Sequence, residues 1–289
     1  MATAPNLADT PPVPSKPGMA KKWLVAILVL TFAFVLMPFL LWYMTTFSRP
    51  LTDRELGAYF TDSLHPRRAQ HALSQVADRI VSPNPAVRAL AKPWYSEVVK
   101  ASSEGSDELR VTAAWVMGQD NQSPEFHGAL LKQLNDSNPM VRRNAALSLV
   151  RFGDASGHDI IVGMLGTYEL KTPRSGVLAM RLKAGDAINP GTMVAHVEVP
   201  GEKAEVRSVV PGTIQQWIAQ DGATVQAGDP IIKVDPSPEM VWESLRALYL
   251  IGQKSDAQAV DRYARGMEGM QPQIQQQAVL TAKAISERR

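Results

Sequence analysis

The sequence predicts a mainly α-helical protein. It would consist of one transmembrane helix followed by an α-solenoid, a stack of helix pairs, with a small all-β domain inserted. Three observations predict this fold class. An uncharged apolar run lies near the N-terminus, a helical spacing recurs through most of the remaining chain, and valine-rich alternating segments interrupt that recurrence between residues 176 and 235. A chain of 289 residues is long enough for about two domains.

The composition is that of an ordinary globular protein, with 45% hydrophobic and 20% charged residues. A net charge of +2 gives no indication of a nucleic-acid-binding face. The chain has no cysteine, which excludes disulfides, cysteine-ligated metals, thiol catalysis and lipid attachment to a cysteine.

The N-terminal part is expected to anchor the chain in a membrane. Residues 1–20 are rich in proline and small residues and are expected to form a flexible tail. A transmembrane helix is predicted over residues 21–47, because the uncharged core at 23–43 is long enough to cross about 30 Å of hydrocarbon. Trp23 at one end and Trp42 near the other suit the two membrane interfaces.

Two questions about this segment stay open. A cleaved signal peptide is the alternative to an anchor, although the run is longer than usual and no A-x-A cleavage site follows it. The lysine pair at residues 21–22 favours a tail inside and the rest of the chain translocated. We therefore expect a single-pass protein of the bacterial inner (cytoplasmic) membrane with its soluble part in the periplasm. The alternative is a cytoplasmic soluble part, because arginines also follow the span.

A second pattern predicts stacked helix pairs over residues 48–170 and 238–289. It consists of proline, any residue, a β-branched aliphatic residue and, four residues later, alanine. Proline suits the first helical turn, and the aliphatic residue and the alanine share one face. The copies begin at Pro85, Pro139 and Pro272, and a copy without proline begins at Leu109.

These residues resemble the HEAT repeat, including its phycobilisome-lyase-like short form. Residues 136–154 carry the best match. The resemblance implies an α-solenoid that binds other proteins, and it implies that Arg142 ties successive repeats together. Trp115 is expected in the core, beside the alanine pair of a repeat helix.

Between residues 174 and 236 an all-β domain with two equivalent halves is predicted. Valine and isoleucine alternate with polar residues there, and residues 183–198 recur in pattern as residues 220–235. The recurring glycines fall where turns need a positive φ. Such a repeat favours a small barrel-like sandwich with a pseudo-twofold axis, inserted into the solenoid.

This segment is similar to the biotinyl/lipoyl domain and to its unmodified relatives in membrane-fusion adaptors of the HlyD type. In carrier members a lysine at the tip of the hairpin between the halves holds the cofactor. Here Gly201 stands at that position, after Pro200, and Lys203 is expected on the returning strand. We therefore expect no cofactor, with modification of Lys203 as the less favoured alternative.

No motif for catalysis or metal binding was found. The five histidines form no H-x-x-x-H or H-E-x-x-H pattern, and no P-loop, G-x-S-x-G or G-x-G-x-x-G is present. We expect no enzyme, no catalytic residue, no metal site and no small-molecule substrate. The candidate contacts with partner proteins are Pro200, Gly201, Trp217, Arg67 and Arg68, with Trp217 open between a core and a contact role.

These features favour a membrane-anchored scaffold or accessory subunit that binds other subunits of a membrane complex. A membrane-fusion-type adaptor of a transport or secretion system is the first alternative. A lipoyl or biotin carrier is the second.

Overall fold

The structure, a computed structural model, describes residues 18–46, 50–62, 64–199, 201–267 and 269–288. The chain divides into two compact units, of which the first ends at Thr52 and the second begins at Asp53.

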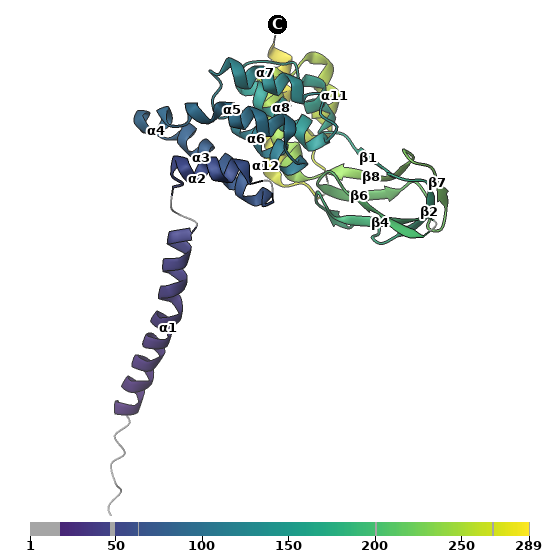
Figure 1. Cartoon of the computed structure of the whole chain (residues 1–289). Coiled ribbons are helices and arrows are strands. Elements are labelled where there is room, and N and C mark those ends of the chain that lie inside the picture. The colour runs from purple at the N-terminus through teal and green to yellow at the C-terminus, as the bar shows by residue number, and fades with distance from the viewer. Residues whose placement is uncertain (1–17, 47–49, 63, 200, 268, 289) are drawn as a thin grey trace, which may run out of the picture. The chain divides into compact units, whose positions relative to one another are not determined.

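Within its described residues, the first unit contains one long helix, α1 (Gly18–Thr46) (Figure 1). Its segment Trp23–Leu40 has a mean hydropathy of 2.6, and none of its side chains is buried. No other helix in the described residues is long and apolar enough to cross a membrane. By length and composition the helix fits a membrane anchor or a signal sequence.

The second unit begins with helices that mostly pack in pairs of chain neighbours. Before the β region these elements are α2 (Asp53–Thr61), α3 (Pro66–Val81), α4 (Pro85–Ala89), η1 (Lys92–Trp94), α5 (Tyr95–Glu104), α6 (Asp107–Met117), α7 (Pro124–Gln133), α8 (Pro139–Arg151) and α9 (His158–Gly163). After it come α10 (Pro238–Ile251), η2 (Lys254–Asp256), α11 (Ala257–Ala264) and α12 (Pro272–Glu287).

Local sequence explains where these helices begin. Proline occupies the first turn of α3, α7, α8, α10 and α12, where a missing backbone N–H costs nothing. Polar side chains cap several of them. The Asn138 Oδ1 accepts a hydrogen bond from the Met140 N–H at 2.8 Å, and the Ser237 Oγ accepts one from the Met240 N–H at 3.3 Å.

The second helices of the pairs stack in chain order. Helix α3 contacts α6, α6 contacts α8, α8 contacts α10, and α10 contacts α12. Helix α9 packs against both α8 and α10, although the whole β region separates α9 from α10 in the chain. The helical packing therefore continues across the β region.

One expected repeat helix is much shorter than the pattern predicts. The copy that begins at Pro85 forms only α4, five residues long and without a buried side chain. Pro93 follows closely, and a proline ring would collide with the carbonyl four residues earlier in a continuing helix. The chain turns instead, and α5 starts at Tyr95.

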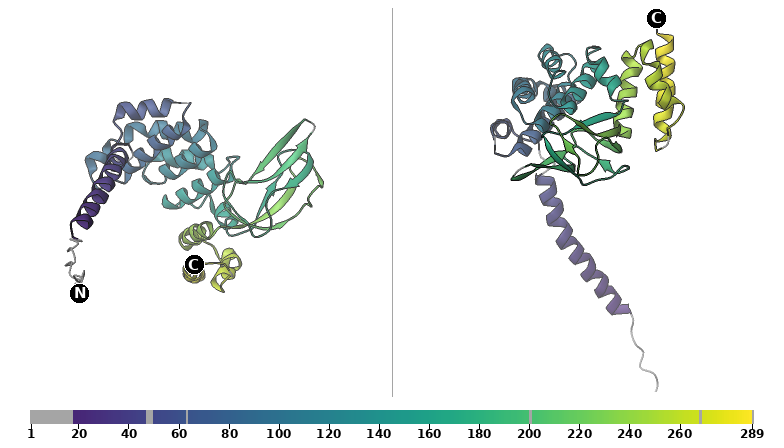
Figure 2. Two further views of the ribbon diagram at one scale, coloured as in Figure 1. Left: turned by 90° about the horizontal axis from the view of Figure 1, so that it is seen from below. Right: turned by 90° about the vertical axis from the view of Figure 1, so that its right-hand side faces the viewer.

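The β region forms two four-stranded antiparallel sheets, the green layers of Figure 2. One sheet has the order β1-β8-β6-β3 and the other β5-β4-β2-β7. The strands are β1 (Tyr168–Lys171), β2 (Gly176–Met180), β3 (Ala187–Ile188), β4 (Met193–Val199), β5 (Glu202–Arg207), β6 (Gly212–Trp217), β7 (Thr224–Val225) and β8 (Pro230–Pro236). Leu178, Ile214 and Val234 lie in the shared apolar core.

The two halves that the sequence predicts contain equivalent hydrogen bonds at their turns. The Gly191 N–H donates to the Ser208 carbonyl at 2.8 Å, and the Gly228 N–H donates to the Thr172 carbonyl at the same distance. Gly191 and Gly228 have φ values of +86° and +91°, in the left-handed region that favours glycine. Strand β1 lies wholly before residue 174, and its first three residues, 168–170, fall in the range predicted to be solenoid.

Candidate protein-interaction surfaces

The hairpin between the two halves of the β region joins β4 to β5. Val199 pairs with Glu202, so two residues make the connection. One is Pro200, which lies outside the described residues. The other is Gly201, with a φ of +87° and open space around the position of a Cβ atom. No side chain that could carry a cofactor stands at this turn position.

Lys203 lies on strand β5, the strand that returns from the hairpin. Its Nζ is 2.9 Å from the Glu198 Oε1 of the paired strand, and both side chains are largely exposed. An exposed ion pair of this kind adds little stability. Lys203 is therefore part of a polar strand surface rather than of a turn.

The edge strand β5 is charged along its exposed side. The Glu202 Oε1 is 2.6 Å from the Arg174 Nη1, and the Glu205 Oε2 is 2.7 Å from the Arg207 Nη2. Charges on an edge strand discourage pairing with a strand of another molecule. Contacts at this edge would therefore be electrostatic rather than strand addition.

Trp217 ends strand β6 and is partly buried. Its ring packs against the core of the β region, and its Nε1 has no hydrogen-bond partner among the described residues. The pairing of β6 with β8 shifts register between Ile214 and Gln216, just before this residue. The side chain supports the core and keeps some exposed surface.

Arg67 and Arg68 both lie exposed in the first turn of α3, but they differ in their contacts. The Arg68 Nη1 is 2.8 Å from the Asp62 Oδ2, and the guanidinium lies 5.5 Å from the centre of the Tyr59 ring. Hydrogen bonds from His65 and Arg68 hold the pKa of Asp62 below its usual value of 3.8. Arg67 forms no ion pair in the part of the chain that the structure describes, so it is the more available of the two.

Arg142 does not tie successive repeats as the resemblance implied. Its Nη1 donates to the carbonyls of Asp136 and Ser137, at 2.6 and 2.9 Å, in the loop before its own helix. The tie comes from Arg110 of the preceding repeat, whose Nε and Nη2 donate to the two Asp136 carboxylate oxygens at 2.7 and 3.0 Å. Arg142 therefore shapes the loop that Arg110 binds.

The prediction of a buried Trp115 is wrong. Ala113 and Ala114 are fully buried, but the Trp115 side chain is 48% exposed. Each residue of an α-helix is rotated by about 100° from the one before, so a buried pair turns the next residue outward. The alanine pair was the signal that could have placed Trp115 on the surface.

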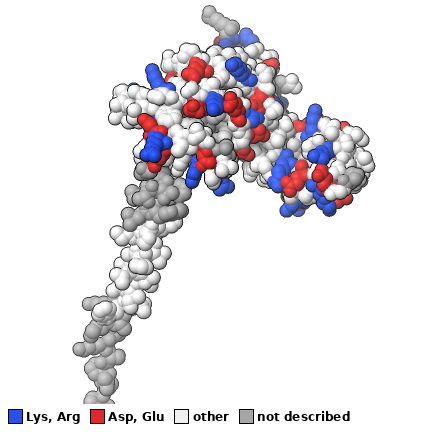
Figure 3. Space-filling view, viewed as in Figure 1, with Lys and Arg blue, Asp and Glu red and all other residues white. Residues whose placement is uncertain are grey.

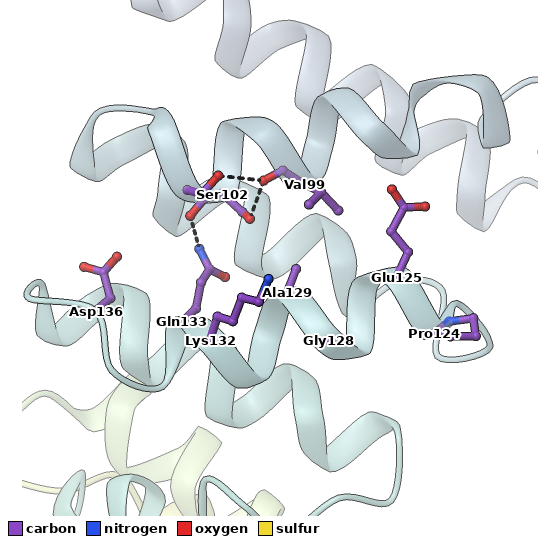
Figure 4. Close-up of a pocket in the computed structure, with 10 residues that line it drawn as sticks. Val99, Ser102, Pro124, Glu125, Gly128, Ala129, Lys132, Gln133 and Asp136 are labelled. Atoms are coloured by element: carbon purple, nitrogen blue, oxygen red, sulfur yellow. Dashed lines mark hydrogen bonds between the residues drawn. The ribbon is translucent and has the colours of Figure 1, made fainter.

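A pocket of about 430 Å³ lies between α5 and α7 (Figure 4). Gln133 is buried at its wall, and its Nε2 donates to the Ser102 carbonyl at 2.9 Å, while the Ser102 Oγ donates to the Val99 carbonyl. Glu125, Lys132 and Asp136 line the rim. The Ser102 hydroxyl is engaged by the Val99 carbonyl, and no histidine is among the residues that line the pocket.

Charged groups of both signs alternate on the face shown in Figure 3, over the helices and the β region alike. Among the described residues, no group of three or more His, Asp or Glu side chains is placed to hold a metal ion.

Comparisons with known proteins match two parts of the chain. A family model described as HEAT repeats matches residues 96–180, and one described as biotin-requiring enzyme matches residues 158–234. The matches overlap over α9, β1 and β2, where the helical repeats give way to the sheets. None of the curated proteins compared with the sequence matches it.

Among solved structures, the chain is similar to an engineered protein known from a crystal structure. The identity is 16%, 82% of this chain and 80% of the other are covered, and the TM-score is 0.41. The two family-model matches alone support HEAT repeats, which suggest protein–protein interaction, and a biotinyl/lipoyl-type region, which suggests an adaptor or carrier fold.

Proposed function

We propose that this protein is a membrane-anchored, non-enzymatic scaffold or accessory subunit that holds a partner protein at the membrane. The observation that carries the proposal is the helical stack that continues across the β region, together with the match of residues 96–180 to HEAT repeats. Repeats of this kind generally mediate protein–protein interactions.

Helix α1 would anchor the protein in the inner membrane of a bacterium. Its apolar length and the exposed side chains of Trp23–Leu40 support an anchor, and an anchor raises the local concentration of whatever the soluble part binds. We place the soluble part in the periplasm. A reporter enzyme that is active only in the cytoplasm, fused to the C-terminus, tests this placement. Activity of that fusion would mean that the soluble part is cytoplasmic.

The β region would act as a second binding element without a cofactor. Gly201 at the hairpin and the ion pair of Lys203 with Glu198 support this view. Intact mass of the purified protein tests it. A mass equal to that of the bare chain is expected, and an increment the size of biotin or lipoate would contradict it.

An adaptor of a transport or secretion system is the second candidate. The two-sheet β region favours it, because membrane-fusion adaptors of the HlyD type contain a related domain. Such adaptors also contain a long helical hairpin, and the described residues show none. Co-purification with an inner-membrane pump would favour this candidate.

The scaffold proposal is tested by extracting the full chain from its own membrane in a mild detergent. We expect it to migrate in native electrophoresis as part of a larger assembly with other proteins. Migration as a bare monomer in its micelle would contradict the proposal.

A further inference from the structure

A groove of about 430 Å³ lies on the helical stack, where α8 and α10 meet and α6 borders them. Three large apolar side chains line it: Trp115 of α6, Leu147 of α8 and Leu250 of α10. Trp115 is 48% exposed and Leu250 is 61% exposed. Large apolar side chains that gather at one exposed groove are typical of a binding surface.

The repeat pattern explains why these side chains face outward. In α6 the buried pair Ala113–Ala114 precedes Trp115, and in α8 the buried pair Ala145–Ala146 precedes Leu147. Successive repeats thus present a large apolar residue at the same position. Trp115 is half exposed, and Leu147 is only partly buried against the core, so both leave apolar surface available for something outside the stack.

The charges around the groove are unequal. Arg151 at the end of α8 and Arg246 of α10 line it together with a single acidic residue, Glu243. None of the three forms an ion pair with any described residue. Two guanidinium groups beside one carboxylate leave an excess positive charge at an apolar surface, which complements a ligand that carries carboxylates.

We propose that this groove binds a peptide segment of a partner protein that combines large apolar side chains with acidic residues. The apolar side chains pack on Trp115 and Leu250, and the carboxylates reach Arg151 and Arg246. Tryptophan and arginine are the residues that most often carry binding energy at interfaces. The inference rests on the proposed scaffold function and specifies the part of the solenoid that performs it.

The probe for this site is a random dodecapeptide library displayed on phage and selected against the full chain in a mild detergent. We expect the recovered peptides to be enriched in Asp and Glu beside Leu, Phe or Trp. A synthetic copy of a recovered peptide should lose affinity at least about tenfold when its carboxylates are replaced by amides. Recovered peptides without acidic enrichment would overturn the proposal.

Variants of the chain locate the site. Trp115→Ala and Leu250→Ser should each lower the affinity of the protein for the synthetic peptide at least about tenfold. The double variant Arg151→Glu/Arg246→Glu should select basic peptides in place of acidic ones. Val279→Ser is the matched control, because Val279 is also apolar and 51% exposed but lies on α12 outside the groove. Equal binding by the control and the groove variants would overturn the proposal.

Two further outcomes are informative. If Trp115→Ala abolishes a homodimer seen in sedimentation of the wild-type chain, the groove binds a second copy and the proposal is wrong. If the groove variants still recover the wild-type partners from the membrane, the groove proposal fails while the scaffold function stands. A wild-type chain that recovers no partner would instead count against the scaffold function.

Discussion

His158 of α9 and Asp256 of η2 are joined by a hydrogen bond of 2.8 Å between the His158 Nε2 and an Asp256 carboxylate oxygen. His158 precedes the β region and Asp256 follows it, and both side chains are mostly buried. Two further bonds reinforce this closure. The Ser244 Oγ donates to the Ile161 carbonyl, and the Tyr263 hydroxyl donates to the Leu165 carbonyl. These contacts hold the helical stack together across the insertion.

The first prediction concerns pH. Burial alone would lower the pKa of His158, but the hydrogen bonds to Asp256 and Asp159 outweigh it and raise the pKa above 6.5. A raised pKa gives stability that is fully present below about pH 6.5 and is lost as the pH rises through the folded-state pKa. His158→Gln should lower the free energy of unfolding by about 1–3 kcal/mol near pH 6 and by less near pH 9.

Urea titrations at the two pH values measure this difference. His65→Gln is the control, since His65 is exposed and bonds only within the loop before α3. A His158→Gln variant whose loss of stability grows with pH would contradict the assignment.

The second prediction concerns the tie between repeats. Burial opposes ionisation of Asp136, but the Arg110 hydrogen bonds outweigh it and hold the Asp136 pKa below 3.8. Its stabilisation is therefore present above about pH 3.8 and is lost as the pH falls through the lowered value. Asp136→Asn should cost about 2 kcal/mol at neutral pH. Asp107→Asn, which removes the exposed partner of the same arginine, should cost less than about 1 kcal/mol.

Thermal unfolding of both variants at neutral pH and near pH 3 gives the comparison. Equal losses for the two substitutions at neutral pH would show that Asp136 is not the stronger partner.

The third prediction concerns a buried arginine at the base of the insertion. Arg143 is 6% exposed, donates to the Met240 Sδ at 3.2 Å and lies over the Tyr168 ring. Burial lowers its pKa to about 10, and it forms no ion pair with a described carboxylate. Because the buried charge is unpaired, Arg143→Met should leave the melting temperature unchanged or raise it. Arg143→Ala should lower stability by about 2 kcal/mol or more through the cavity it leaves.

Calorimetry of the two variants separates the effect of removing the Arg143 charge from the effect of removing its side-chain volume. A strongly destabilised Arg143→Met variant would show that the guanidinium contributes through its polar contacts.

The fourth prediction concerns the β region alone. A Cβ atom at Gly212 would clash with the Asp235 carbonyl of the neighbouring strand, and one at Gly176 would clash with the Glu198 carbonyl at the equivalent place. Gly212→Ala should therefore destabilise the sheets by several kcal/mol, of the order of other severe core substitutions. Thr213→Ala, at the exposed next residue, should have an effect below about 0.5 kcal/mol.

Hydrogen exchange measured for each helix and strand shows which elements lose stability in the Gly212→Ala variant. Protection should decrease in β6 and β8 and persist in α8 and α12. A uniform loss over the helices would mean that the two parts unfold as one.

Most of the β region could be predicted from the sequence because the same turn residues recur in its two halves. Gly191 and Gly228 each require a positive φ, and such requirements are visible without tertiary structure. Strand β1 was missed, because Tyr168–Lys171 carries no turn signal and becomes a strand only by pairing with β8.

Among the candidate contacts, the sequence identified residue types but not their partners. The role expected for Arg142 belongs to Arg110. Both arginines follow a helix start, and only folding decides that Arg110 reaches the Asp136 carboxylate while Arg142 reaches the Asp136 carbonyl. The exposure of Trp115 was missed for a different reason. A tryptophan beside alanines suggests a core, although the helical rotation carries it to the surface.

The central claim is that this protein acts by binding a partner at the membrane through its helical stack. Purification of the tagged full chain from its own membrane, with quantification of every accompanying protein, tests it most directly. We expect the same set of membrane proteins to accompany the wild-type chain and the Val279→Ser variant, in the same amount per tagged chain. The amount per tagged chain should fall with Trp115→Ala or Leu250→Ser. Recovery of the wild-type chain alone, as a monomer, would contradict the claim.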